Sequence, residues 1–219
     1  MIRLHVLCEG QSEESFTKTL LYDHFSPRGI FCTPFLFSSR ERYKGGIVTY
    51  GKVRRQIQML CNQDKSAYVT TFIDYYRLPK DYPEFERRGR DAVDDVCRAE
   101  EAFQQDIDHL APNRNFIANI ISHEFEALLF SDTRAFSSLP EQERLAVLLE
   151  AIRAAFPTPE HIDDGPDTAP SKRILGIYPQ YEKVLHGTSV ALDIGLDVIR
   201  RECPKFDRWL TRLESLATR

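Results

Sequence analysis

The chain has 219 residues, enough for one large domain or for a core with a helical appendage. Hydrophobic residues make up 42% and charged residues 28%, as in an ordinary globular protein. The formal net charge of -4 excludes a protein that binds nucleic acid by bulk positive charge alone, because such binding needs an excess of Lys and Arg. No run of about 18 apolar residues predicts a membrane span, and the first apolar stretch is too short for a signal peptide.

The five cysteines are widely separated, and no two of them have a CxxC spacing. Neither a disulfide framework nor a zinc knuckle is therefore indicated. We expect reduced core cysteines and a cytoplasmic protein.

The first half of the chain alternates predicted strands and helices. Residues 2–8, 29–37, 67–76 and 115–122 have the apolar, β-branched character of strands, and Pro34 suggests an edge position for the second. Residues 11–25, 48–62 and 90–110 have helical apolar spacing, with a loop at 78–85. This order predicts an α/β fold with a mostly parallel sheet flanked by helices.

From residue 141 the pattern is helical. Helices are predicted at 141–156, about 174–185, 189–200 and 206–217, with a proline-rich loop at 157–170. We therefore expect an α/β catalytic core over residues 1–139 and a helical C-terminal region, residues 140–219, packed on it.

Carboxylates follow three of the predicted strands. Glu9 and Glu13 come after the first, Asp74 ends the third, and Glu124 and Glu126 follow the fourth. The carboxyl ends of parallel strands meet at one edge of a sheet, where ligands bind, and carboxylate oxygens suit Mg²⁺ or Mn²⁺. A metal site is favoured over the alternative, in which acids in a first helical turn merely complement the helix dipole.

Two further residues are candidates beside these acids. His123 adjoins Glu124 and would ligate a metal, orient a carboxylate or touch a phosphate, with a structural hydrogen bond as the alternative. Lys172 lies in the first turn of a predicted helix capped by Ser171, where a positive charge opposes the dipole. It would stabilise negative charge in phosphoryl transfer, or simply face solvent.

Several common catalytic motifs are missing. The sequence has no GxSxG elbow, no Walker-type phosphate loop and no dinucleotide glycine fingerprint. A serine hydrolase, an autonomous NTPase and a Rossmann dehydrogenase therefore lose their usual support.

Four segments together resemble a bacterial family. "CEGQSEESF", "TTFIDYYRLP", "SHEFEALLFSD" and "APSKRI…YPQYEKVLHG" are similar, in this order, to an uncharacterised family with a TOPRIM-like fold, related to the nuclease domain of the OLD proteins. The resemblance runs from residue 2 to about residue 213. It implies a TOPRIM-like sheet with a divalent metal that serves to cut DNA.

The resemblance also implies site residues. Glu9 matches the acid after the first strand, Asp74 the first Asp of a DxD pair, Ser122 with Glu124 a later Ser-x-Glu step, and Lys172 a distal lysine. Tyr76 stands where the second Asp would be, which puts occupancy by two metals in doubt, and Glu126 is a candidate to replace it.

The first functional hypothesis is a Mg²⁺- or Mn²⁺-dependent nuclease. Its catalytic residues would be Glu9, Asp74, Glu124 and Lys172, and its metal ligands Glu9, Glu13, Asp74, Glu124 and Glu126. DNA is the expected partner rather than RNA, and the resemblance implies an ABC- or SMC-type ATPase partner in phage defence. The alternatives are a catalytically inactive TOPRIM-like regulatory or scaffold subunit that binds such an ATPase and, more weakly, a primase- or phosphatase-like phosphoryl transferase.

Overall fold

A computed structural model of the chain describes residues 1–37, 49–76, 78–85, 92–110, 115–139, 143–162, 165 and 167–218. The predicted boundary between residues 139 and 140 lies at the edge of the described residues. No helix in these segments is long and apolar enough to cross a membrane.

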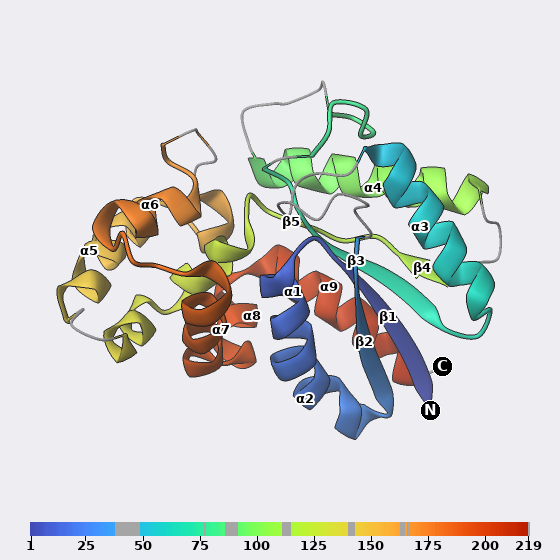
Figure 1. Cartoon of the computed structure of the whole chain (residues 1–219), viewed down its shortest axis with the longest axis horizontal. Coiled ribbons are helices and arrows are strands. Elements are labelled where there is room, and N and C mark those ends of the chain that lie inside the picture. Colours follow the sequence, from blue (N-terminus) through green and yellow to red (C-terminus); the bar gives the residue numbers. More distant parts are fainter. Residues whose placement is uncertain are drawn as a thin grey trace.

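A parallel sheet forms the centre of the molecule (Figure 1). Its strands are β1 (Ile2–Cys8), β2 (Ile30–Leu36), β3 (Tyr68–Asp74), β4 (Phe116–Ile117) and β5 (Ile120–Ile121). The order is β2-β1-β3-β4, β5 pairs with β3, and every pairing is parallel. The predicted α/β fold class is confirmed, and β2, which contains Pro34, is an edge strand as expected.

The predicted strand over residues 115–122 is interrupted. Asn119 separates β4 from β5 because side chains replace the regular ladder there. Its backbone N–H donates to Thr71 Oγ1 at 3.0 Å, its side-chain amide donates to the Thr71 carbonyl at 3.0 Å, and Thr71 Oγ1 donates to the Asn119 carbonyl at 2.7 Å. After the break, β5 pairs with β3 at Ile73 and Asp74, so the acidic turn (residues 123–126) begins beside the end of β3.

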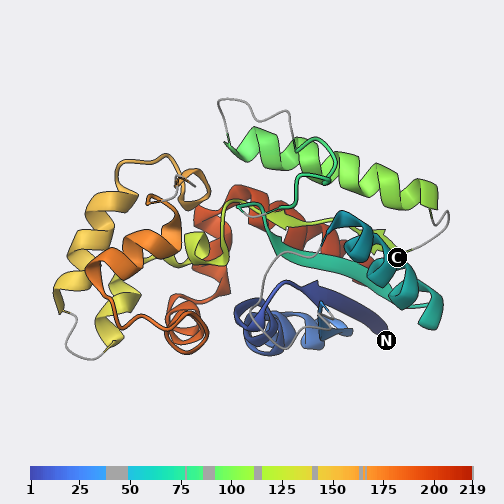
Figure 2. The same cartoon turned by 45° about the horizontal axis from the view of Figure 1, so that its top comes forward.

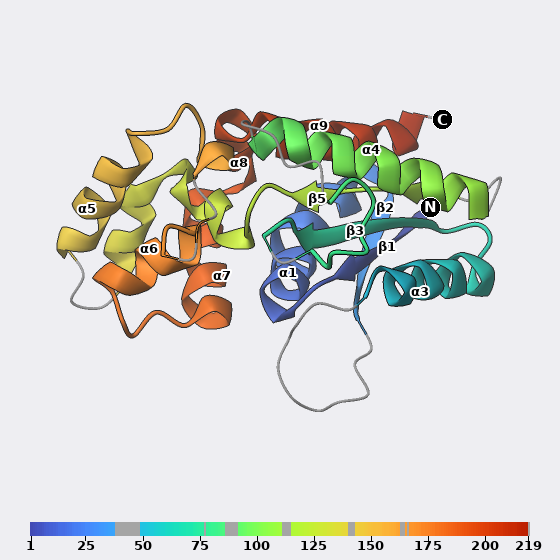
Figure 3. The same cartoon turned by 90° about the horizontal axis from the view of Figure 1, so that it is seen from above.

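Helices cover both faces of the sheet (Figure 1), and Figure 3 looks down on one of these faces. On one face lie α3 (Tyr50–Gln63) and α4 (Ala92–Leu110), whose apolar side chains pack with Val69 and Ile73 of β3. On the other face lie α1 (Gln11–Phe16), a π-helical turn (Thr17–Leu21), α2 (Tyr22–Phe25) and the C-terminal helix α9 (Pro204–Glu214). Both faces of β3 are therefore buried, which explains its continuous apolar sequence.

The helical region after the sheet lies beyond the carboxyl ends of the strands (Figure 2). It consists of the 3₁₀ helices η3 (Phe125–Ser131), η4 (Thr133–Ser138) and η5 (Pro159–His161) and the α-helices α5 (Glu143–Arg153), α6 (Pro170–Ile177), α7 (Lys183–Ile194) and α8 (Leu196–Glu202). The chain then returns to the face of the sheet as α9, which is followed by η6 (Ser215–Thr218). One apolar core runs from β1 through this region to Leu216, so the two predicted parts share a core.

The predicted helix at about 174–185 is wrong in its bounds. The helix α6 ends at Ile177, and α7 starts only at Lys183. Pro179 explains the break, because the residue before a proline is disfavoured in the helical conformation. Lys183 thereby becomes the first residue of a helix instead of an interior one.

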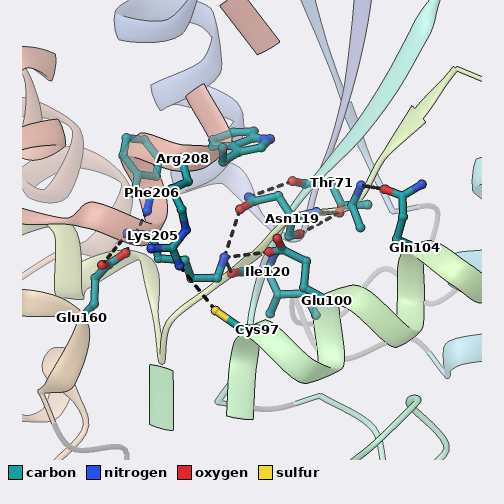
Figure 4. A network of polar contacts seen from close by, with 12 residues as sticks. Thr71, Cys97, Glu100, Gln104, Asn119, Ile120, Glu160, Lys205, Phe206 and Arg208 are labelled. Atoms are coloured by element: carbon teal, nitrogen blue, oxygen red, sulfur yellow. Dashed lines mark hydrogen bonds and ion pairs between the residues drawn. The ribbon is translucent and has the colours of Figure 1, made fainter. Parts of the chain in front are cut away.

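Buried charges hold α9 on the sheet (Figure 4). Lys205 is only 3% exposed; its Nζ lies 2.7 Å from Glu100 Oε2 and also donates to the Ile120 carbonyl. Glu160 accepts from the backbone N–H groups of Lys205 and Phe206 at 2.8 and 2.9 Å, and so caps the helix. The network joins α4, β5 and η5 to α9, which fixes the edge of the sheet from which the acidic turn departs.

Candidate metal centre at the carboxyl edge of the sheet

Glu9 is tied to the end of the neighbouring strand. It follows β1 directly, and its backbone N–H donates to the carbonyl of Phe72 in β3 at 3.0 Å. Its Oε2 accepts from the backbone N–H of Asp74 at 2.9 Å. The first and third strand ends therefore place their carboxylates side by side, as the sequence predicts.

Glu13 is buried and serves its own helix. The N-cap of α1 is Gly10, and Gly10 donates its N–H to Glu13 Oε2 at 2.8 Å. The structural alternative, an acid that stabilises the first turn of its own helix, therefore applies to Glu13. Burial raises the pKa of Glu13 to about 7, and the carboxylates of Glu9 and Glu126 raise it further. This influence of the neighbouring acids makes Glu13 part of the same site.

Asp74 joins the β1 side of the site to the acidic turn. Its Oδ1 accepts from the backbone N–H of Phe125 at 2.9 Å. Burial holds the pKa of Asp74 well above its usual range, and all four glutamates raise it further, in the order Glu13, Glu9, Glu126 and Glu124. The fold thus brings the five predicted carboxylates into one electrostatically coupled group.

The acidic turn has a strained start. His123 is buried and has a left-handed backbone with φ of 63°, and its carbonyl accepts from the backbone N–H of Tyr76 at 2.8 Å. Left-handed backbone is costly for a residue other than glycine. It turns the chain so that Glu124 resumes an extended backbone and Phe125 begins η3 beside Asp74.

Glu124 and Glu126 face the helical region. Glu124 Oε2 accepts from the backbone N–H of Ser171 in α6 at 3.0 Å. Glu126 is 1% exposed, and burial raises its pKa although Lys183 opposes this change. Each side chain is thus held by an element far away in the sequence.

The lysine at the carboxylates is Lys183, not Lys172. Lys172 is exposed, and no side-chain hydrogen bond or ion pair joins it to any described residue. Lys183 Nζ lies 3.2 Å from both oxygens of Glu126 and 3.7 Å from Glu124 Oε1. The helix α6 contributes the backbone of Ser171 instead of a charge, and its N-cap is Ala169 where the sequence suggested Ser171.

Sequence reasoning missed Lys183 because it placed this residue inside a helix. Once the break at Tyr178–Glu182 is known, the dipole argument applied to Lys172 applies with equal force to Lys183, the first residue of α7. A proline two residues after an apolar helical run was the available signal.

Tyr181 also lies close to the acids. Its hydroxyl is buried without a hydrogen-bond partner among the described residues, and burial, followed by the charges of Glu126 and Glu124, raises its pKa. The glycine at Gly187 gives it room, since a Cβ there would lie 2.8 Å from the hydroxyl oxygen. Ser122 Oγ is likewise buried and lacks a partner in the described part of the chain.

The donor chemistry fits a hard divalent ion. Carboxylate oxygens are the ligands that Mg²⁺ and Mn²⁺ prefer. Burial raises the pKa values of Asp74 and Glu13, repulsion from the neighbouring carboxylates raises them further, and a cation would relieve this repulsion. Within the described segments, however, no three His, Cys, Asp or Glu side chains already form an arrangement that would hold a metal ion. Binding therefore requires side-chain rearrangement at this edge.

Basic residues cluster in two parts of the sequence, at residues 40–55 and 200–212, and one described arginine of each cluster is paired with acids. Arg40, Arg42 and Lys44 lie outside the described residues, whereas Arg54 pairs with Asp106 at 2.9 Å. Near the C-terminus, Arg200 bonds to Asp207 and Glu214. These described arginines are held mainly by the protein's own carboxylates.

A cavity of about 640 Å³ lies elsewhere, between η4, α5 and α8. Its charged lining is internally paired, with Arg134 bonded to Asp132 and Arg153 to Glu202. None of the five carboxylates lines it.

Comparison with known proteins gives one family and two similar structures. The family model described as "Domain of unknown function (DUF4276)" matches residues 8–214. The C-terminal region of the Xanthomonas campestris pv. campestris OLD protein phased with iodine is similar over 100% of this chain and 97% of that chain, at 16% identity and a TM-score of 0.47. The same region phased with mercury gives 100% and 99%, 13% identity and 0.44. None of the curated proteins compared matches the chain.

Proposed function

The chain belongs to the DUF4276 family, and we propose that it is a Mg²⁺- or Mn²⁺-dependent nuclease with a TOPRIM-like fold that cleaves DNA phosphodiester bonds. One observation carries the proposal: carboxylates that follow three separate strands lie at one edge of a parallel sheet, where the four glutamates add to burial in raising the pKa of Asp74. Crowded, buried carboxylates repel one another unless protons or a cation neutralise them, and a divalent ion would do so.

The proposed reaction is hydrolysis. A water oxygen forms a bond to phosphorus, one P–O ester bond breaks, the water's proton passes to a carboxylate or to solvent, and the leaving sugar oxygen takes a proton from water. A bound divalent ion supplies Lewis-acid stabilisation of the phosphoryl oxygens and an activated water. Glu9, Glu13 and Asp74, with Glu124 and Glu126, would hold this ion.

Lys183 takes the role that the sequence assigned to Lys172. Its Nζ lies within ion-pair distance of both Glu124 and Glu126, so it would offset the charge that develops on the phosphoryl group. Burial tends to lower the pKa of Lys183, but the carboxylates of Glu126, Glu124 and Asp74 outweigh this and raise it. The amine therefore remains charged at neutral pH.

The proposed biological setting is that of an effector subunit that acts with an ABC- or SMC-type ATPase in phage defence. The support is the resemblance in sequence, together with the lack of a Walker-type loop in this chain. DNA is proposed over RNA on the same ground.

The test is cleavage of supercoiled plasmid by purified protein with Mg²⁺ or Mn²⁺. The variants Glu9→Gln and Asp74→Asn should lose activity by at least about a hundredfold, whereas Glu101→Gln, an exposed change on α4, should not. Equal cutting by all four proteins would overturn the assignment. A matched RNA substrate in parallel distinguishes the polymer.

A second candidate is a regulatory or scaffold subunit without catalysis. Tyr76 favours it, because a phenol there replaces a carboxylate at the exit of β3. This reading requires that the protein bind no Mn²⁺ in calorimetry and still co-purify with a neighbouring ATPase.

A further inference from the structure

A cavity of about 250 Å³ lies between α4 and α9, on the side of the sheet where β4 is the outermost strand. The two helices lie side by side there, as Figure 3 shows. Its lining includes three cations of α9, one helical turn apart: Lys205, Arg208 and Arg212. It also includes two acids of α4, Glu100 and Glu101. The lining therefore keeps one net positive charge in a protein whose formal net charge is -4.

The base of the cavity is held by hydrogen bonds. Lys205 Nζ lies 2.7 Å from Glu100 Oε2, so these two buried charges neutralise each other. The side-chain amide of Gln104 pairs with the outer edge of β4: its Nε2 donates to the Phe116 carbonyl at 3.1 Å, and its Oε1 accepts from the backbone N–H of Ala118 at 2.8 Å. The strand edge behind the cavity is thus complete without a further strand, and it is in place before any ligand binds.

The guanidinium groups of Arg208 and Arg212 have only neutral partners among the described residues. Arg208 Nη2 lies 3.4 Å from Cys97 Sγ (Figure 4), and Arg212 Nη2 lies 3.3 Å from Gln104 Oε1. A guanidinium group has five N–H donors, and a thiol is a weak acceptor. In the described part of the chain, most donors of these two arginines therefore have no acceptor, and no carboxylate there forms an ion pair with either.

This arrangement suits a phosphate group. Two guanidinium groups one turn apart match an anion that has several acceptor oxygens, and a phosphodiester has two free oxygens and one negative charge. The cavity is smaller than the roughly 300 Å³ at which pockets for small organic ligands begin, so it suits a single anionic group of a larger molecule better than a whole cofactor.

The cavity lies close to the acidic turn along the chain. Lys205 also donates to the carbonyl of Ile120 in β5, the strand that pairs with the end of β3 at Asp74. Ile120 precedes Glu124 by four residues, which places their Cα atoms at most about 14 Å apart. A few nucleotides of a DNA strand span such a distance.

We propose that Arg208 and Arg212 bind a backbone phosphate of the nucleic acid substrate, at a nucleotide other than the one that is cut. The inference rests on the proposed function and adds a substrate contact to it. Such a contact fixes the position of the strand without reading its sequence. It also gives an acidic protein one local place at which a polyanion is attracted.

The test is the binding of a fluorescein-labelled DNA oligonucleotide in EDTA, followed by anisotropy at several salt concentrations. Arg208→Gln and Arg212→Gln should each weaken binding about fivefold to tenfold on any sequence. Because both arginines hold the same phosphate, the double variant should lose less than the product of the two effects, and its plot of log affinity against log salt should be shallower by about one.

Two further variants serve as controls. Arg208→Lys keeps the charge and should keep the salt dependence of the wild type. Arg144→Gln removes the same charge from an exposed position on α5 and should change neither the affinity nor the salt dependence. Thermal melting of each variant shows that it is folded.

Equal DNA binding by the wild type and the double variant would overturn this inference and leave the proposed nuclease intact, since that function is tested by cleavage. Inorganic phosphate that binds the wild type but not the double variant, with equal DNA binding by both, would assign the cavity to free phosphate and also overturn it. The cleavage rate at saturating DNA should be the same in the wild type and in both arginine variants. A large loss of that rate would place the arginines at the reacting bond and contradict the proposed position.

Discussion

The backbone N–H of Ser171 donates a hydrogen bond to Glu124 Oε2 at 3.0 Å, across 47 residues of sequence. This bond fixes the start of α6 against the acidic turn. Because Ser171 uses its backbone here and its side chain is buried, the next residue, Lys172, points away into solvent. The positive charge at the carboxylates comes from the start of the following helix instead.

The two lysines should behave differently in DNA cleavage. Lys183→Ala should lower the cleavage rate about 10²- to 10³-fold, since it removes charge stabilisation in the transition state. Lys172→Ala should stay within about twofold of wild type, because Lys172 reaches none of the acids. Single-turnover rates on plasmid DNA provide the comparison, and the reverse order would restore the prediction from sequence.

Metal affinity should depend on pH through Glu13. Its pKa near 7 means that it holds a proton in much of the metal-free protein at neutral pH, and a metal must displace that proton. Mn²⁺ affinity should therefore rise from pH 6 to pH 8, with proton release that differs between buffers of different ionisation enthalpy. Calorimetry in two buffers measures it, and pH-independent affinity would contradict the prediction.

Stability of the metal-free protein should depend on pH in the opposite sense. A carboxyl whose folded pKa is raised from 4.5 to about 7 contributes stability that is fully present below pH 4.5 and lost as the pH rises through 7. The melting temperature without metal should therefore fall between pH 5 and pH 8. The melting temperature of Glu13→Gln should fall less over this pH range. If it falls as much as that of the wild type, other titrating groups cause the effect.

The left-handed backbone at His123 predicts an unusual ranking of two substitutions. His123→Gly should be more stable than His123→Ala by about 1 kcal/mol, since only glycine adopts a φ of 63° without strain. Both variants lose the imidazole, so their difference isolates the backbone. Urea unfolding measures it; an advantage for alanine would mean that the turn is not strained.

The buried cation under α9 should be a major contributor to stability. Lys205→Met leaves Glu100 and the Ile120 carbonyl without their buried partner and should cost about 3 kcal/mol. Arg212→Met, on the exposed side of the same helix, should cost less than about 0.5 kcal/mol. Equal midpoints of chemical unfolding for the two variants would contradict this account.

The local pattern of apolar residues was sufficient to predict the long central strands of the sheet. The apolar runs around Val6 and Phe72 are buried on both sides, so their composition alone indicates parallel strands, and the acids after them follow from where such strands end. The break at Asn119 was not predictable, because it depends on a cross-strand partner, Thr71, that no local pattern specifies.

The sequence by itself determined the α/β class, the edge position of β2 and the choice of Glu9, Asp74 and Glu124 as residues that share one rim, because strand periodicity and strand ends are local properties of the chain. Only the tertiary structure decided which lysine meets these acids and how each carboxylate is held. Those contacts join β1 to β3 and the acidic turn to α6 and α7, and their partners are set by packing between segments tens of residues apart.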